Sequence, residues 1–233
     1  LPGDQEQLLM ELKKTGKPLI VVLINGRPLS INWAAANADA ILEAWYPGSH
    51  GGTALAEVIL GDYNPGGKLT VTFPKTVGQI PFNFPYKPNS QVDGNSKPGI
   101  DGNQSRVNGS LYDFGFGLSY TTFEYGKAVC RRSGKGFKVS VDVTNTGERE
   151  GKEIVQLYIS DNESSLERPV KELKGFRKVA LAPGETKRVT FEIEPDMLKF
   201  YDPQRGWVLE DGDFTAHVGA ASDDIRTMVS FCI

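Results

Sequence analysis

Residues 45–74, WYPGSHGGTALAEVILGDYNPGGKLTVTFP, decide how the first third of the chain is expected to fold. The apolar run before them stops at Pro47-Gly48, which is typical of a buried strand that is then broken. Residues 53–60 repeat their apolar side chains at helical spacing, and residues 69–73 alternate as a strand does. Strand, helix and strand within about thirty residues predict one right-handed crossover of a parallel sheet.

The ends of these elements carry recognisable signals. Ser49 is the expected N-cap of the helix at 53–60, and Gly61 the expected left-handed C-cap. Upstream, Asp4 is the expected N-cap of an amphipathic helix whose apolar stripe ends before Gly16. The members of that stripe are Leu8, Leu9 and Leu12.

Between these two helices lies an uninterrupted apolar run, LIVVLI at 19–24, typical of a strand covered on both faces. A short helix at 31–37 and a strand at 39–45 follow, so the first third is expected to read α-β-α-β-α-β. Three parallel strands cannot protect their own edges and faces. We therefore expect the first strands of this sheet to lie upstream of Leu1, in a longer protein; the absence of an initiator Met agrees with that.

Regular periodicity vanishes over residues 77–112, which are rich in Pro, Gly, Asn and Ser and predict a long loop. The aromatic and glycine-rich strip at 111–120, LYDFGFGLSY, comes next. From residue 121 the apolar period switches to two, with turn signals every ten or so residues, and predicts about seven short strands of an antiparallel β-sandwich. Cys130 and Cys232 fall on its expected first and last strands, where they would be either bridged or free.

Composition excludes several functional classes. The net charge of −3, with Lys and Arg scattered, argues against a nucleic-acid or anionic membrane surface. No apolar run approaches the roughly 20 residues of a membrane span. Neither a nucleotide-binding glycine motif nor a set of residues with metal-ligand spacing is evident, so no cofactor or metal is expected.

Three segments carry a resemblance to a known family: AWYPGSHGG, LAEVILGDYNPGGKLTVTFP and DFGFGLSYTTF at 113–123. They closely resemble the C-terminal half of family 3 glycoside hydrolases, the β-glucosidase and β-xylosidase group. The resemblance runs from LPGDQ at 1–5 to the last strand. It departs at His50, where many members carry an acidic residue, and over 89–108, a segment that varies widely among such enzymes.

The resemblance implies an architecture. Residues 1–76 would be the C-terminal part of an α/β three-layer sandwich with a mostly parallel sheet, incomplete here. Residues 77–120 would be a long loop and aromatic linker. Residues 121–233 would be an all-β, immunoglobulin-like or fibronectin type III-like sandwich.

The resemblance also implies the chemistry. Such enzymes are retaining, exo-acting β-glycosidases, and retention needs two carboxyl groups roughly 5–5.5 Å apart. In the family the nucleophilic aspartate lies in an N-terminal barrel, and the acid/base glutamate just precedes the LPGDQ-type sequence. Both would be absent here, so the chain would support and shape the active site but be inactive alone.

Candidate site residues inside the chain lie near residue 45. Trp45 and Tyr46 either form a sugar-stacking wall or pack between domains. His50 follows a turn at the carboxyl end of a strand, where ligands of α/β sheets bind, and is either a substrate contact or a surface histidine. Glu43, inside an apolar strand, is the carboxylate expected to have a perturbed pKa. The other carboxylates of this third, Asp39, Glu57 and Asp62, are expected to be solvated or to act as caps.

Three functions are compatible with these patterns: the C-terminal region of a β-glycosidase, a stand-alone polysaccharide-binding or adhesion module, and a nucleotide-binding α/β domain fused to a sandwich. The third lacks a phosphate loop, and the incomplete sheet argues against the second. We favour the first. Its expected partners are the N-terminal barrel of the same enzyme and an oligosaccharide, with a homodimer through the open sheet edge as a further expectation. The resemblance implies a periplasmic or extracellular location.

Overall fold

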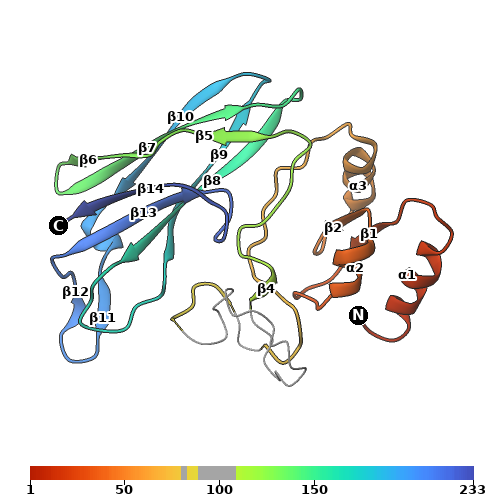
Figure 1. Ribbon diagram of the computed structural model, residues 1–233, viewed down its shortest axis with the longest axis horizontal. Helices are drawn as coiled ribbons and strands as arrows, with labels where there is room; N and C mark the ends of the chain where they lie inside the picture. Colours follow the sequence, from red (N-terminus) through yellow and green to blue (C-terminus); the bar gives the residue numbers. More distant parts are fainter. Residues whose placement is uncertain (80–82, 89–108) are drawn as a thin grey trace, which may run out of the picture. The chain divides into compact units, whose positions relative to one another are not determined.

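The computed structural model describes residues 1–79, 83–88 and 109–233. The chain divides into two compact units: residues 1–63, 71–82 and 90–112 form the first, and residues 64–70, 83–89 and 113–233 the second. Strands outnumber helices among the described elements (Figure 1). Part of the long loop expected at 77–112, including all of 89–108, lies outside the described residues.

The first unit contains three α-helices and two small sheets among its described residues. Strand β1 pairs in parallel with β2, and β3 pairs antiparallel with β4. Its buried apolar residues include Leu19, Val21, Leu23, Ile31 and Phe73. The elements are α1 (Gln5–Lys13), β1 (Ile20–Leu23), α2 (Asn32–Asn37), β2 (Ala40–Glu43), α3 (Gly51–Leu60), β3 (Phe73–Pro74) and β4 (Ser110–Tyr112).

The third parallel strand expected at 69–73 does not form. The backbone of Leu69 instead exchanges hydrogen bonds with the aromatic strip: Leu69 N donates to Phe116 O, and Gly115 N donates to Leu69 O, both at 2.8 Å. Only Phe73, at the end of the run, enters a strand, and its partner is Tyr112 rather than β2. The alternating pattern was a correct sign of extended backbone, but it could not identify the partner.

Helix ends agree with the sequence in part. Gly61 is the left-handed C-cap of α3, with φ 85°, as expected. Asp4 occupies the N-cap position of α1, as expected, but makes no side-chain capping bond. The N-cap of α3 is His50 rather than Ser49. The expected Ser49 cap is therefore wrong, because a turn in which Gly51 N donates to Gly48 O at 3.2 Å places the helix start later.

The second unit is a β-sandwich. One sheet has the order β10-β7-β5, with β6 also paired to β7, and the other has the order β14-β13-β8-β9. Strands β11 and β12 form a separate hairpin. The elements are β5 (Phe123–Tyr125), β6 (Val129–Ser133), β7 (Gly136–Asn145), β8 (Gly151–Asp161), β9 (Glu172–Leu181), β10 (Thr186–Ile193), the 3-10 helix η1 (Pro195–Met197), β11 (Phe200–Asp202), β12 (Gly206–Val208), β13 (Asp213–Gly219) and β14 (Ile225–Cys232).

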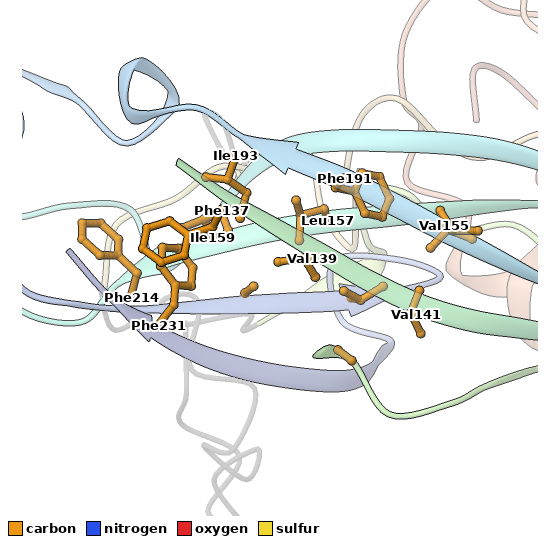
Figure 2. Packing of buried hydrophobic residues seen from close by; sticks show 14 of the residues in the cluster. Phe137, Val139, Val141, Val155, Leu157, Ile159, Phe191, Ile193, Phe214 and Phe231 are labelled. Atoms are coloured by element: carbon orange, nitrogen blue, oxygen red, sulfur yellow. The ribbon is translucent and has the colours of Figure 1, made fainter. Parts of the chain in front are cut away.

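The core of the sandwich lies between the two sheets (Figure 2). Alternate residues of β7, which include Val139, Val141 and Val143, are fully buried, as period-two patterning requires. At one end Phe231 packs against Phe137 and Phe214, with ring centroids 4.6 and 5.6 Å away. The predicted all-β sandwich is confirmed. Strands β5 and β11 were not expected, because each is only three residues long.

Strand β8 is buried on both faces, since the aromatic strip covers the face opposite the core. Gln156 Nε2 donates to Gly115 O at 3.1 Å and to Ala220 O at 2.6 Å. Gly115 has φ 84°, and a Cβ there would collide with the Gln156 side chain. Phe114 stacks on Phe84, whose edge meets the buried Tyr158 ring. Glycine is therefore required at 115 both for its backbone conformation and for close approach.

Residues 64–70 are held on the sandwich by a largely buried ion pair. Lys68 Nζ lies 3.5 Å from Glu153 Oε1, and the two side chains are 11% and 5% exposed. Lys68 also donates to Gly117 O at 2.9 Å, and Tyr125 Oη donates to the same carboxylate oxygen at 2.8 Å. Burial raises the pKa of Glu153, while the Lys68 charge opposes that shift.

The structure also shows the state of the two cysteines and the character of the described helices. Both cysteines are free: Cys130 is half-buried on β6, and Cys232 is exposed on β14. Among the described residues, no helix has the length and apolar character needed to cross a membrane.

Replacing Lys68 by alanine leaves the Glu153 carboxylate buried without its cation. We expect the free energy of unfolding to fall by about 3–5 kcal/mol, as measured by urea unfolding. Lys138 is the matched control, because its 3.1 Å pair with Glu192 is exposed, and K138A should cost less than about 1 kcal/mol. Equal losses in the two variants would contradict a structural role for the buried pair.

His217 should make stability depend on pH. Its Nε2 lies 2.8 Å from Ser160 Oγ, and burial, assisted by the nearby Lys171 charge, lowers its pKa to about 4. An unfolded histidine titrates near pH ~6.5, so the folded state binds the proton less readily. Neutral His217 therefore contributes its full stabilisation of the folded state above pH ~6.5. This stabilisation is lost as the pH falls toward the pKa of about 4 that His217 has in the folded state.

Between pH 7 and 5, wild-type stability should therefore fall by roughly 1–2 kcal/mol more than that of His217→Asn. Urea unfolding at each pH measures this difference. The chain has two histidines, and His50→Asn, at the exposed one, should keep the wild-type pH dependence. The same slope in wild type and His217→Asn would contradict the prediction.

Candidate functional site

The carboxyl ends of β1 and β2 lie side by side in the first unit, with Leu23 paired to Glu43. Ligands of open α/β sheets bind just outside the carboxyl ends of the strands, the side that is here called the edge of the sheet. The loop that contains Asn25 follows β1, and the turn that begins at Trp45 follows β2. Two loops that the sequence separates by some twenty residues are thus brought to one edge by the parallel pairing.

Glu43 organises this edge through both of its carboxylate oxygens. Its Oε1 accepts from the Trp45 backbone N–H at 3.0 Å, and its Oε2 accepts from Asn25 Nδ2 at 3.4 Å. Partial burial raises the pKa of Glu43, and the two hydrogen bonds counteract this shift. The pKa of Glu43 is thus perturbed, as expected, and the perturbation is upward. Its role here is to fix the turn after β2 to the loop after β1.

Trp45 occupies a strained backbone conformation, with φ 49°. A bulky residue at positive φ is rare and persists only where its surroundings hold it. Here the Glu43 hydrogen bond and the ring contact with Phe73, 6.0 Å between centroids, hold it. Phe73 in turn meets Tyr112 at 6.2 Å, so the Trp45 ring belongs to an aromatic cluster inside the unit. This geometry is that of a packing aromatic, with its ring only half-buried.

Tyr46 and His50 are the accessible members of the predicted set. Tyr46 is 79% exposed, and its ring lies against Gly26, where a Cβ would clash with it. His50 is exposed at the N-cap position of α3 and makes no capping bond. The structure therefore brings Trp45 and Tyr46 to the edge of the sheet next to Glu43. Among the described residues, no hydrogen bond links His50 to them.

Sequence reasoning missed Asn25. Its Oδ1 is buried without a hydrogen-bond partner among the described residues, as is Ser30 Oγ in the same loop. Such atoms are rare in native structures and call for an explanation, such as an unfilled binding role. The only sequence signal was the Asn25-Gly26 pair directly after a strand, which is typical of an ordinary turn.

The carboxylates of the first unit do not assemble into a pair at this edge. Asp39 lies at the other end of β2, where it accepts from Lys13 at 2.8 Å and from Leu19 N at 2.7 Å. Glu57 and Asp62 are exposed, as expected of solvated groups. Within the described part of the chain, this edge can therefore orient polar groups of a ligand through Glu43 and Tyr46. It does not supply two carboxylates for glycoside hydrolysis.

Two family profiles match the chain. The one described as glycosyl hydrolase family 3 C-terminal domain matches residues 1–120, and the one described as fibronectin type III-like domain matches residues 153–222. The second match falls within the β-sandwich.

Similar proteins agree with the profiles. The chain is 44% identical over 97% of its length to a periplasmic beta-glucosidase of Salmonella typhimurium, and 46% identical over 98% to a beta-xylosidase of Formosa agariphila. It spans only 30% and 32% of those two relatives.

Solved structures give the same result. A beta-glucosidase from Listeria innocua in complex with glucose superposes over 100% of the chain with a TM-score of 0.89 at 36% identity, and 33% of that structure is covered. A β-glucosidase from Erythrobacter marinus gives a TM-score of 0.89 at 40% identity, with 30% covered. Sequence and fold together show that the chain belongs to family 3 of the glycoside hydrolases, as its C-terminal domain followed by a fibronectin type III-like domain.

Proposed function

We propose that this protein is a retaining, exo-acting β-glycosidase that removes terminal non-reducing glucose or xylose from β-linked oligosaccharides. The observation that carries the proposal is the similarity, over nearly the whole chain, to relatives named as β-glucosidases and β-xylosidases. No single sugar is favoured, because both kinds of relative are similarly close.

The role of this chain within the enzyme is to support and shape the active site. Glu43 is the carboxylate at the ligand-binding edge of the described sheet, and it is already engaged in positioning Trp45. Two carboxylates are needed for retention. Both are therefore proposed to come from a part of the enzyme beyond these residues, an N-terminal barrel with the segment that joins it to the sheet.

Exposed apolar side chains in the first unit support an extended sheet. Large leucine and isoleucine side chains are at least 42% exposed, several of them on α1 and β1, where a complete domain would bury them. They are Leu8, Leu12, Ile20, Ile24, Ile59 and Leu60. We propose that β1 and β2 belong to a larger, mostly parallel sheet of a three-layer sandwich. The proposed boundaries are 1–76 for this part, 77–120 for the loop and linker, and 121–233 for the fibronectin-like domain.

Location and assembly follow from the same relatives. One of them is named a periplasmic beta-glucosidase, and a periplasmic or extracellular setting is proposed here. The same exposed apolar surface would contact the barrel part of the enzyme, and a homodimer through it is the alternative.

At the sheet edge, Tyr46 and His50 are the proposed substrate contacts, and Trp45 the residue that supports them. Tyr46 is exposed and rests on the loop after β1. An aromatic ring with a hydroxyl at its tip can stack on a sugar and hydrogen-bond to it.

The 233 residues expressed alone should not hydrolyse aryl β-glucosides or β-xylosides, whereas the protein isolated from its natural host should. Release of the aryl alcohol measures both. An inactive natural protein would contradict the proposed function. Turnover by the 233-residue chain that disappears in Glu43→Gln but persists in Glu57→Gln would show instead that Glu43 is itself catalytic.

Replacing Tyr46 or His50 by alanine in the natural protein should raise KM for an oligosaccharide roughly three- to tenfold, while kcat stays within about twofold. Steady-state kinetics on a β-linked trisaccharide measure both parameters. Leu60→Ala is the control, because that side chain is 76% exposed on the same unit but has no polar tip. Unchanged KM in both variants would remove Tyr46 and His50 from the site.

A further inference from the structure

Two exposed aromatic rings lie opposite each other on the β11–β12 hairpin, which projects from one end of the sandwich (Figure 1). Tyr201 pairs directly with Trp207, and their side chains are 60% and 69% exposed. The ring centroids are 5.8 Å apart and the planes meet at 73°, so the rings form a corner. Among the described residues, neither the Tyr201 hydroxyl nor the Trp207 indole N–H has a hydrogen-bond partner.

The hairpin that carries these rings is rigidly held. Asp202, only 7% exposed, accepts from the backbone N–H groups of Gln204 and Arg205 at 2.7 and 3.0 Å, which closes the turn. Its second oxygen accepts from Arg205 Nε at 2.8 Å. Below the turn, Phe200 is buried under the Arg168 guanidinium, 4.7 Å from the ring centroid. A ligand that binds Tyr201 and Trp207 therefore has little backbone entropy to overcome.

Charged groups lie in the turn of the same hairpin and just after it. Arg205 Nη2 donates to Glu210 Oε1 at 2.7 Å and to Ser165 Oγ at 2.9 Å. Exposed aromatic faces with free polar tips, on a rigid element beside charged groups, have the chemistry that recognises a sugar. The C–H face of a pyranose packs on a ring while its hydroxyls reach the polar groups.

We propose that Tyr201 and Trp207 form a binding site for a segment of a β-linked polysaccharide. The choice of ligand rests on the proposed function, because an enzyme that acts on β-linked sugars meets such chains. The site would hold the polymer on the fibronectin-like sandwich and so raise the local concentration of chain ends.

The size of the patch fits a saccharide better than a protein. An aromatic side chain buries roughly 150–250 Å² when fully covered, so two that are about two-thirds exposed offer no more than about 350 Å². A stable protein interface needs about 800 Å² from each partner. A second copy of the chain would find too little apolar surface here.

The test measures retardation of the natural protein in native gels that contain a soluble mixed-linkage β-glucan or a soluble β-xylan. Trp207→Ala and Tyr201→Ala should each raise the apparent Kd for at least one polymer roughly three- to tenfold. Trp207→Phe, which keeps a ring, should lose less. Phe176→Ala is the matched control, because Phe176 is 60% exposed on β9 of the same sandwich and pairs with no aromatic ring among the described residues.

Hydrolysis of an aryl β-glycoside separates this proposal from the proposed function. It should be unchanged in all four variants, and each variant should unfold at the wild-type urea concentration. Retardation without hydrolysis in the wild type would contradict the function and leave the binding site standing. Hydrolysis without retardation, equal retardation of wild type and Trp207→Ala, or a change of oligomeric state in that variant would overturn the binding site.

Discussion

Strand β8 is buried on both faces, and the organisation of the second unit follows from that constraint. One face carries Val155 and Leu157 into the core, with Glu153 on the same face toward the start of the strand, and the other face carries Gln156 and Tyr158. Buried polar groups are costly unless their hydrogen bonds are satisfied. Segments 64–70 and 113–117 supply those partners, through Lys68 and through the backbone of the aromatic strip. A sandwich made only of its own strands would leave these side chains uncovered.

The sequence predicted those features of the fold that depend on neighbouring residues, and it did not predict those that depend on pairing between distant segments. The sandwich strands β7, β8, β10 and β13 were predictable, because a two-residue period and turn residues suffice to define them. The Gly61 cap was equally local. The prediction of a third parallel strand at residues 69–73 was wrong, because alternating apolar residues cannot show which strand is the partner. The stripe of α1 was a correct sign of a helix, yet Leu8 and Leu12 are exposed, since no surface among the described residues covers them.

The candidate site was predictable in part for a similar reason. The carboxyl end of a strand pointed to Trp45 and Tyr46, and burial pointed to Glu43. What the sequence could not show was that each oxygen of the Glu43 carboxylate accepts a hydrogen bond, one of them from Asn25 in the loop after β1. Parallel pairing creates that contact, and the positive φ of Trp45 is a product of the same closure. The glutamate at the end of this apolar strand therefore holds the loop after β1 and the turn after β2 together through its hydrogen bonds.

The participation of residues 64–70 in the second unit has a consequence for how such enzymes diversify. A sandwich whose boundary fell at one point in the chain could be shuffled between genes as a cassette. This one draws on three separated stretches, and Gly66 packs so closely on the Lys152 backbone that a side chain there would clash. Recombination at any single point between residues 68 and 121 would separate Lys68 from Glu153. The two domains are therefore constrained to be inherited together.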